Sequence, residues 1–172
     1  MRIRIAAVSL SVLLAAGAIA SAALADSGST TSNCGRLTTP SGPVTVRIAP
    51  TSLWPPNHKM RTVTIGMTDP DNDGDVISLN VGTITNSEQG HEKGSTANTS
   101  PDAVVSQPNP KPGVDGTAVP DLSTTIQLRA ERNGGDRDGR TYSVPVTCTT
   151  EEGTGTTTLT VHVPHDQGHR NR

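Results

Sequence analysis

The sequence predicts an all-β protein: one antiparallel β-sandwich of about seven strands, tied by a single disulfide bond. Several short segments alternate apolar with polar residues, which is the pattern of strands with one buried face and one wet face. Turn-forming sequences such as "DPDNDGD", "NGGDRDG" and "EEGTG" separate these segments. The 172 residues include no Phe, one Trp and one Tyr, so the chain can build only one small core.

The first residues predict a secretory signal peptide, residues 1–25. Arg2 and Arg4 precede an Ala/Leu/Val-rich run that starts at Ile5, and "ALA" supplies small residues for cleavage after Ala25. An uncleaved membrane anchor is the alternative, because the run is nearly long enough to span a bilayer. Its many Ala and Ser residues and its small-residue exit favour cleavage. We therefore expect a secreted, extracellular chain that leaves the membrane after cleavage.

The charge of the mature chain argues against two classes of partner. Removing residues 1–25 leaves 12 of the 14 Lys+Arg and all 16 Asp+Glu, a net charge of −4. Mild acidity is unfavourable for binding nucleic acid, whose phosphates would be repelled. It also offers no basic patch for an anionic lipid surface.

The chain contains two cysteines, Cys34 and Cys148. In an oxidising compartment an isolated pair is expected to form a disulfide. Such a bond would close most of the mature chain into one loop, which on chain-entropy reasoning contributes about 4–5 kcal/mol. A metal site and a reactive thiol are the alternatives.

The mature chain divides into a flexible polar leader (26–40), the sandwich (41–164) and a polar tail (165–172). A stretch from Asn86 to Leu122 loses its periodicity and is too long for a simple loop; it contains a short expected strand at 103–106.

Pro145 has no amide hydrogen, so its strand should lie at a sheet edge there or bulge. The six alternating segments are Val44–Ile48, Val63–Met67, Ile77–Val81, Ile126–Glu131, Tyr142–Cys148 and Leu159–Val163. Short strands, regular turns and a cysteine pair suggest an immunoglobulin-like sandwich.

The stretch "TDPDNDGDVISLN" begins like a calcium loop. Asp69, Asp71 and Asp73 alternate before Gly74, so their carboxylates can converge on one hard cation while the glycine permits the tight turn. The twelfth position is Asn80 where a calcium-binding hand has Glu, and a strand follows, which excludes a helix–loop–helix hand.

Other acidic turns are candidates for completing a calcium site if they gather at the same end of the sandwich. Packing several carboxylates together without a cation is costly. Two interpretations stay open: a Ca²⁺ site with a dissociation constant of about 0.1–1 mM, or turns of good turn-forming residues that stay solvated. The further candidate ligands are Asp75, Glu131, Asp136 and Asp138.

Trp54, in "SLWPPNHKM", is the largest apolar side chain in the sequence. Because the chain has so few large residues, we expect Trp54 to plug the core, with Pro55 and Pro56 fixing its approach. The alternative is an exposed indole that contacts a ligand, for example by stacking on a sugar.

Five motifs carry a resemblance to a family. "SLWPPNHKM", "TDPDNDGDVISL", "SPDAVV", "QLRAERNGGDRDGRTYSVPVTC" and "VPHDQG" resemble the immunoglobulin-like or cadherin-like repeat of secreted bacterial proteins, over residues 52–168. The resemblance implies an accessory β-sandwich at the cell surface. In cadherin-like relatives, acidic turns bind calcium between domains, and here that role would fall on Asp69, Asp71 and Asp73, with Glu131 as a partner.

These observations predict an exported, non-enzymatic binding or structural module that calcium tightens at its Asp-rich end. The alternative is a carbohydrate- or matrix-binding module that uses Trp54 and the 86–122 loop. The expected partner is an extracellular protein or a polysaccharide. An enzyme is not expected, because no catalytic pair of side chains is visible in the sequence.

Overall fold

The computed structural model describes residues 28–70, 78–88, 100–106 and 121–165. Within these ranges the protein is all-β, with nine strands and no helix. The prediction of about seven strands is therefore too low. The strands are β1 (Thr30–Thr39), β2 (Gly42–Ala49), β3 (Met60–Thr68), β4 (Ser78–Val81), β5 (Thr85–Asn86), β6 (Ala103–Val105), β7 (Asp121–Arg129), β8 (Arg140–Thr150) and β9 (Gly153–Val163).

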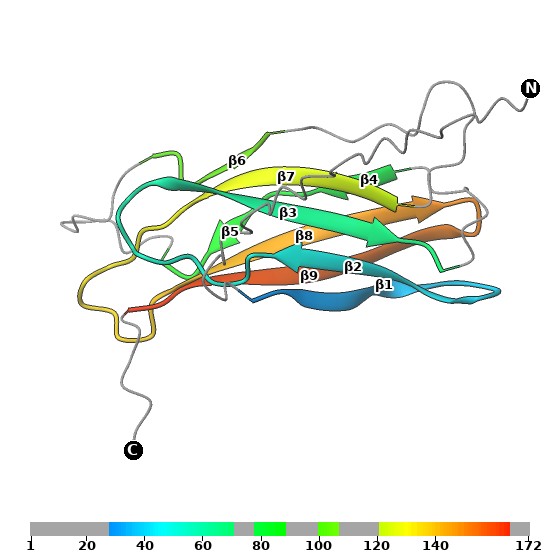
Figure 1. Cartoon of the computed structure of the whole chain (residues 1–172), viewed down its shortest axis with the longest axis horizontal. Coiled ribbons are helices and arrows are strands. Elements are labelled where there is room, and N and C mark those ends of the chain that lie inside the picture. The colour runs from blue at the N-terminus through cyan, green and yellow to red at the C-terminus, as the bar shows by residue number, and fades with distance from the viewer. Residues whose placement is uncertain (1–27, 71–77, 89–99, 107–120, 166–172) are drawn as a thin grey trace, which may run out of the picture.

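The strands form two antiparallel sheets that face each other (Figure 1). The first has five strands in the order β1-β2-β3-β7-β6. In the second, β8 is the central strand: β9 pairs along its whole length on one side, and β4 and β5 pair with separate parts of its other side. The core lies between the sheets, where alternate residues of both are buried.

The predicted alternation is confirmed in the strands that build the core. Val44, Val46 and Ile48 of β2 are fully buried, while Arg47 between them is exposed. In β8 every second residue from Arg140 to Thr150 is buried. The largest fully buried side chain is Tyr142.

β1 corrects the prediction of a flexible polar leader, which is wrong for residues 30–39. This strand pairs with β2, and the register shifts between Asn33 and Thr38. The shift turns Cys34 and Leu37 into the core, where Cys34 forms the predicted disulfide with Cys148 of β8, with 6.3 Å between the Cα atoms. A strand of the first sheet is therefore tied covalently to the second.

Pro145 lies inside the second sheet and not at its edge. The strand that pairs with this part of β8 is interrupted instead. β4 ends at Val81 and β5 begins at Thr85, so the gap between them lies opposite Pro145. The Gly82 N–H still donates to the Pro145 carbonyl at 2.9 Å, but Pro145 has no N–H to return. The missing donor accounts for the break between β4 and β5.

Several connections meet at one end of the sandwich. The start of β3 pairs with the end of β7 (Met60 with Arg129), and the start of β8 pairs with the end of β9 (Arg140 with Val163). The segments 50–59, 87–88, 100–102 and 130–139 therefore lie at this end, which we call the loop end (Figure 1). Leu53 is anchored there: its N–H donates to the His162 carbonyl at 2.9 Å, and its side chain is buried.

The expected signal peptide lies outside the described residues, as do most of the polar tail and most of the 86–122 stretch. None of the described segments forms a helix with the length and apolar character needed to cross a bilayer.

Candidate functional site

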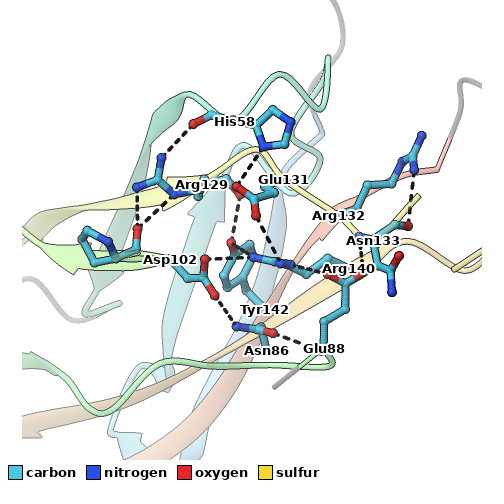
Figure 2. Close-up of polar contacts among 11 residues, drawn as sticks. His58, Asn86, Glu88, Asp102, Arg129, Glu131, Arg132, Asn133, Arg140 and Tyr142 are labelled. Carbon is cyan, nitrogen blue, oxygen red and sulfur yellow. Dashed lines mark hydrogen bonds and ion pairs between the residues drawn. The ribbon is translucent and has the colours of Figure 1, made fainter. Parts of the chain in front are cut away.

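A buried ionic network organises the loop end, and we call it the Arg140 cluster (Figure 2). Its members come from the ends of several strands and the connections between them. They are His58, Glu88, Asp102, Arg129, Glu131, Arg140 and Tyr142.

Arg140, the first residue of β8, is at the centre of the cluster. Its Nε donates to Glu88 Oε2 at 2.8 Å, and its Nη1 lies 3.1 Å from Asp102 Oδ1. Its Nη2 lies 3.9 Å from Glu131 Oε1. The Arg140 side chain is only 3% exposed. Burial by itself lowers the pKa of Arg140, but hydrogen bonds to Tyr142 and Glu88, together with the attraction of nearby groups such as Asp102, outweigh burial and raise it, so the guanidinium stays charged.

Tyr142 connects the guanidinium to the backbone. Its hydroxyl accepts a hydrogen bond from Arg140 Nη1 at 3.2 Å and donates one to the Arg129 carbonyl at 2.9 Å. The Arg140 guanidinium also lies 5.9 Å from the centre of the Tyr142 ring, within cation–π range. Burial raises the pKa of Tyr142 to about 12, and the hydrogen bond from Arg140 partly opposes this rise.

Arg129, the last residue of β7, fastens two connections through backbone carbonyls. Its Nε and Nη2 donate to the Pro101 carbonyl at 3.1 and 2.8 Å, and its Nη1 donates to the His58 carbonyl at 2.8 Å. The planar guanidinium suits this because its several N–H groups have a fixed geometry. The 54–59 and 100–102 segments are thus held to the same side chain.

Glu88 and Asp102 have further partners besides Arg140. Glu88 Oε1 accepts from the Asn133 N–H at 2.8 Å, which holds the 130–139 connection. Asp102 Oδ2 accepts from Asn86 Nδ2 at 3.0 Å. Each oxygen of these two carboxylates has a protein donor, so Glu88 and Asp102 act as structural anchors of the loop end.

His58 extends the cluster to the surface. Its Nδ1 lies 3.0 Å from Glu131 Oε2; the Glu131 side chain is 0% exposed and the His58 side chain 51% exposed. The His58 backbone has a φ of 62°, and its N–H donates to the Ala130 carbonyl at 2.9 Å. A buried carboxylate and two backbone hydrogen bonds, from the His58 N–H to Ala130 and from Arg129 to the His58 carbonyl, therefore position an exposed imidazole.

The structure does not bring together Asp69 and Glu131, two of the predicted calcium ligands. Asp69 follows β3 at the end where Thr68 pairs with Asp121, whereas Glu131 follows β7 at the opposite end. The full length of the β3–β7 ladder, about 26 Å at strand geometry, separates them. Glu131 therefore does not lie beside Asp69, because antiparallel pairing places the end of β3 and the end of β7 at opposite ends of the ladder.

The remaining predicted ligands fall in two places. Asp71, Asp73 and Asp75 lie outside the described residues. Asp136 and Asp138 lie in the 130–139 connection at the loop end, where Asp136 Oδ1 accepts from the Asp138 N–H at 3.0 Å. Across the described part of the chain, no three His, Cys, Asp or Glu residues are grouped to hold a metal ion.

Trp54 is 39% exposed, so the prediction that it plugs the core is wrong. Its neighbour Leu53, at 2% exposure, fills the core instead. Alternate side chains of an extended segment point in opposite directions, and burying Leu53 therefore turns Trp54 outward.

The sequence reasoning missed the Arg140 cluster, although one signal was available. Arg140 stands two residues before Tyr142, on the side of the strand that faces the core. The next residues on that side are Val144 and Val146. A charged residue on the core side of a strand requires partners. Its partners, at positions 88, 102 and 131, are too far apart in the sequence to form a recognisable motif.

Comparisons with protein-family models, with curated proteins and with solved structures found no match for this chain.

Proposed function

We propose that the chain is an exported, non-enzymatic binding or structural module with an immunoglobulin-like sandwich, and that its loop end is the binding surface. The observation that carries this proposal is the combination of a loop end held by the Arg140 cluster with an exposed Trp54. Loops fixed in advance lose little entropy when they bind. An exposed aromatic ring on such a support is a typical binding anchor.

The strand order supports the immunoglobulin-like part of the proposal. The order β2-β3-β7-β6 corresponds to A-B-E-D, and β4/β5-β8-β9 corresponds to C-F-G. Tyr142, near the start of β8, donates back to the Arg129 carbonyl, as the conserved tyrosine does at the E–F corner of such domains. Two features are additional: β1 precedes the A-like strand, and the disulfide joins β1 to β8.

Export and the absence of catalysis have direct tests. Mass spectrometry of the culture supernatant should find a chain that begins at Asp26, with Cys34 and Cys148 linked. Recovery of an uncleaved chain from membranes would contradict export. Assays on generic ester, peptide and glycoside substrates should show no turnover, and turnover that depends on the purified chain would overturn the non-enzymatic proposal.

Calcium is proposed as a weak stabilising ion of the Asp-rich turn, residues 69–75. Alternate carboxylates favour a hard cation, and extracellular modules bind calcium with dissociation constants of about 0.1–1 mM. An ion that binds only the folded state raises the thermal midpoint as its concentration rises. The midpoint should therefore rise in millimolar CaCl₂ and return in EDTA, with no such response in Asp71→Asn/Asp73→Asn. An unchanged midpoint would remove calcium from the proposal.

A carbohydrate ligand is the second candidate function, and the exposure of Trp54 favours it. Sugar rings stack their C–H faces on exposed aromatic rings, and Trp54 is the single tryptophan of the chain. Its fluorescence therefore reports contact at one known position. Titration with dextran, laminarin and galactomannan should produce a saturable change in emission for at least one of them. A spectrum unchanged by all three would argue against a saccharide ligand.

A further inference from the structure

His58 has a backbone conformation that is unusual for its residue type. Its φ of 62° is left-handed, and it is the single non-glycine residue with a positive φ in the described part of the chain. Such a conformation is strained for a residue with a side chain, and it persists only where surrounding contacts impose it. Those contacts are the hydrogen bonds from its N–H to Ala130 and from Arg129 to its carbonyl. Glycine or asparagine would meet the backbone requirement at lower cost.

The His58 imidazole makes a side-chain hydrogen bond that glycine could not make. The Glu131 carboxylate lies within 3.9 Å of the Arg140 guanidinium, and a carboxylate only accepts hydrogen bonds. His58 Nδ1 therefore donates to Glu131 Oε2, at 3.0 Å. That bond fixes the ring orientation, and the second ring nitrogen, Nε2, points away from Glu131 (Figure 2). Glu131 acts as a positioning residue for a half-exposed His58.

Trp54 supplies an exposed aromatic surface on the same short segment as His58. Trp54 precedes His58 by four residues, so their Cα atoms are at most about 14 Å apart. Two prolines lie between them, and each fixes its own φ. A stacking surface and an oriented hydrogen-bonding nitrogen are thus held on one short segment whose two ends are fastened at Leu53 and at His58.

We propose that Trp54 and His58 form one saccharide subsite, in which Trp54 stacks on a sugar ring and His58 Nε2 hydrogen-bonds a sugar hydroxyl. A hydroxyl suits this position because it both donates and accepts, so it pairs with Nε2 in either protonation state of the imidazole. The repeated hydroxyls of a saccharide supply that group beside a face that stacks on indole. This inference rests on the carbohydrate function proposed above.

The test uses the mature, disulfide-bonded chain and the polysaccharide among dextran, laminarin and galactomannan that gives the largest change in Trp54 emission. His58→Asn keeps a residue that tolerates positive φ but removes the imidazole. Because one hydrogen bond contributes about 0.5–1.5 kcal/mol, affinity should fall roughly three- to tenfold. Lys59→Ala, at an adjacent exposed residue, is the matched control and should bind like the wild type. Thermal midpoints verify that both variants fold.

Nitrogen-15 NMR of the His58 ring gives a readout that a purely structural role would not move. Adding the polysaccharide should shift the Nε2 resonance and leave Nδ1, which faces Glu131, largely unchanged. Wild-type binding with unaltered affinity in His58→Asn, or with an equal loss in Lys59→Ala, would overturn the subsite and leave the carbohydrate function standing. Wild-type emission unchanged by all three polysaccharides would overturn the carbohydrate function itself, and the subsite with it.

Discussion

The hydroxyl of Tyr142 joins two parts of the loop end, the end of β7 and the start of β8. It donates to the carbonyl of Arg129, where β7 ends, and accepts from the guanidinium of Arg140, where β8 begins. Tyr142 is fully buried, so water does not replace either bond when the hydroxyl is removed. One oxygen atom therefore closes the connection between two strands of different sheets.

Tyr142→Phe should lower the free energy of unfolding by about 1–3 kcal/mol, because it removes two buried hydrogen bonds, one to the Arg129 carbonyl and one from Arg140 Nη1. Urea denaturation monitored by circular dichroism measures the change. Ser143→Ala, on the outward-facing side of the same strand, is the control and should change the free energy of unfolding by less than about 0.5 kcal/mol. Equal stability of the two variants would show that the Tyr142 hydroxyl contributes nothing.

The raised pKa of Tyr142 makes stability depend on pH in the alkaline range. The pKa is about 12 in the folded chain against an ordinary value of 10.0, so between these values the unfolded chain has lost a proton that the folded chain retains. Stability is therefore complete below pH 10 and falls as pH rises toward 12, by about 1.4 kcal/mol per pH unit at most. Tyr142 is the only tyrosine, so phenolate absorbance follows its ionisation directly. The slope should be smaller in Tyr142→Phe, and an ordinary phenolate titration near pH 10 would contradict the prediction.

At the residue scale, alternation predicted the buried aliphatic positions but not the polar ones. Val44, Val146 and Val161 are buried as their patterns require, since a period of two depends only on neighbours in the chain. Trp54 was misplaced because size alone does not decide which of two adjacent residues faces inward, and Leu53 took the core position. The calcium prediction assumed that acidic turns gather at one end, whereas the strand register places Asp69 and Glu131 at opposite ends.

At the scale of elements, β1 depends on close contact with β9. Gly155 of β9 is buried, and a Cβ atom there would collide with the Cys34 carbonyl and lie 2.9 Å from Leu37 Cβ. The glycine is required by space, because backbone atoms of β1 occupy the position of its side chain. The sequence did not predict β1, since its two core residues, Cys34 and Leu37, lie within a register shift and break the period of two.

Gly155→Ala should destabilise the protein by about 1–3 kcal/mol, the usual cost of forcing an extra carbon into a packed site. Gly66→Ala in β3 is the matched control, because the nearest atom to an added Cβ there is the Leu122 carbonyl oxygen at 3.9 Å, an ordinary contact. Replacing a strand glycine without a clash should be neutral or stabilising. Thermal and urea unfolding of the two variants in the oxidised state measure the difference, and equal effects would show that the β1–β9 approach is adaptable.

At the scale of the whole molecule, two kinds of link join the sheets: one is covalent and the other is ionic. The disulfide attaches β1 of the first sheet to β8 of the second. Arg140 of β8 binds Asp102, next to β6, and Glu131, next to β7, which are both strands of the first sheet. A chain with one Trp, one Tyr and no Phe has limited apolar area to bury, so covalent and ionic links carry a larger share of the stability than they would in a bigger core.

The most severe single change should be Arg140→Ala. It would remove the guanidinium that pairs with the buried carboxylates of Glu88 and Glu131, and removing one partner of a buried ion pair typically costs about 3–5 kcal/mol. Arg47→Ala is the control, because Arg47 is exposed and makes a surface hydrogen bond to Ser29; it should cost less than about 0.5 kcal/mol.

Arg140→Lys keeps the charge but not the fork of donors, so its loss of stability should fall between those of the other two variants and remain measurable if Arg140→Ala does not fold. Urea unfolding at low and high salt completes the test, because buried pairs are screened far less than exposed ones. A folded Arg140→Ala with the stability of Arg47→Ala would mean that the sheets hold together without the Arg140 cluster, and the support proposed for the Trp54 surface would then be absent.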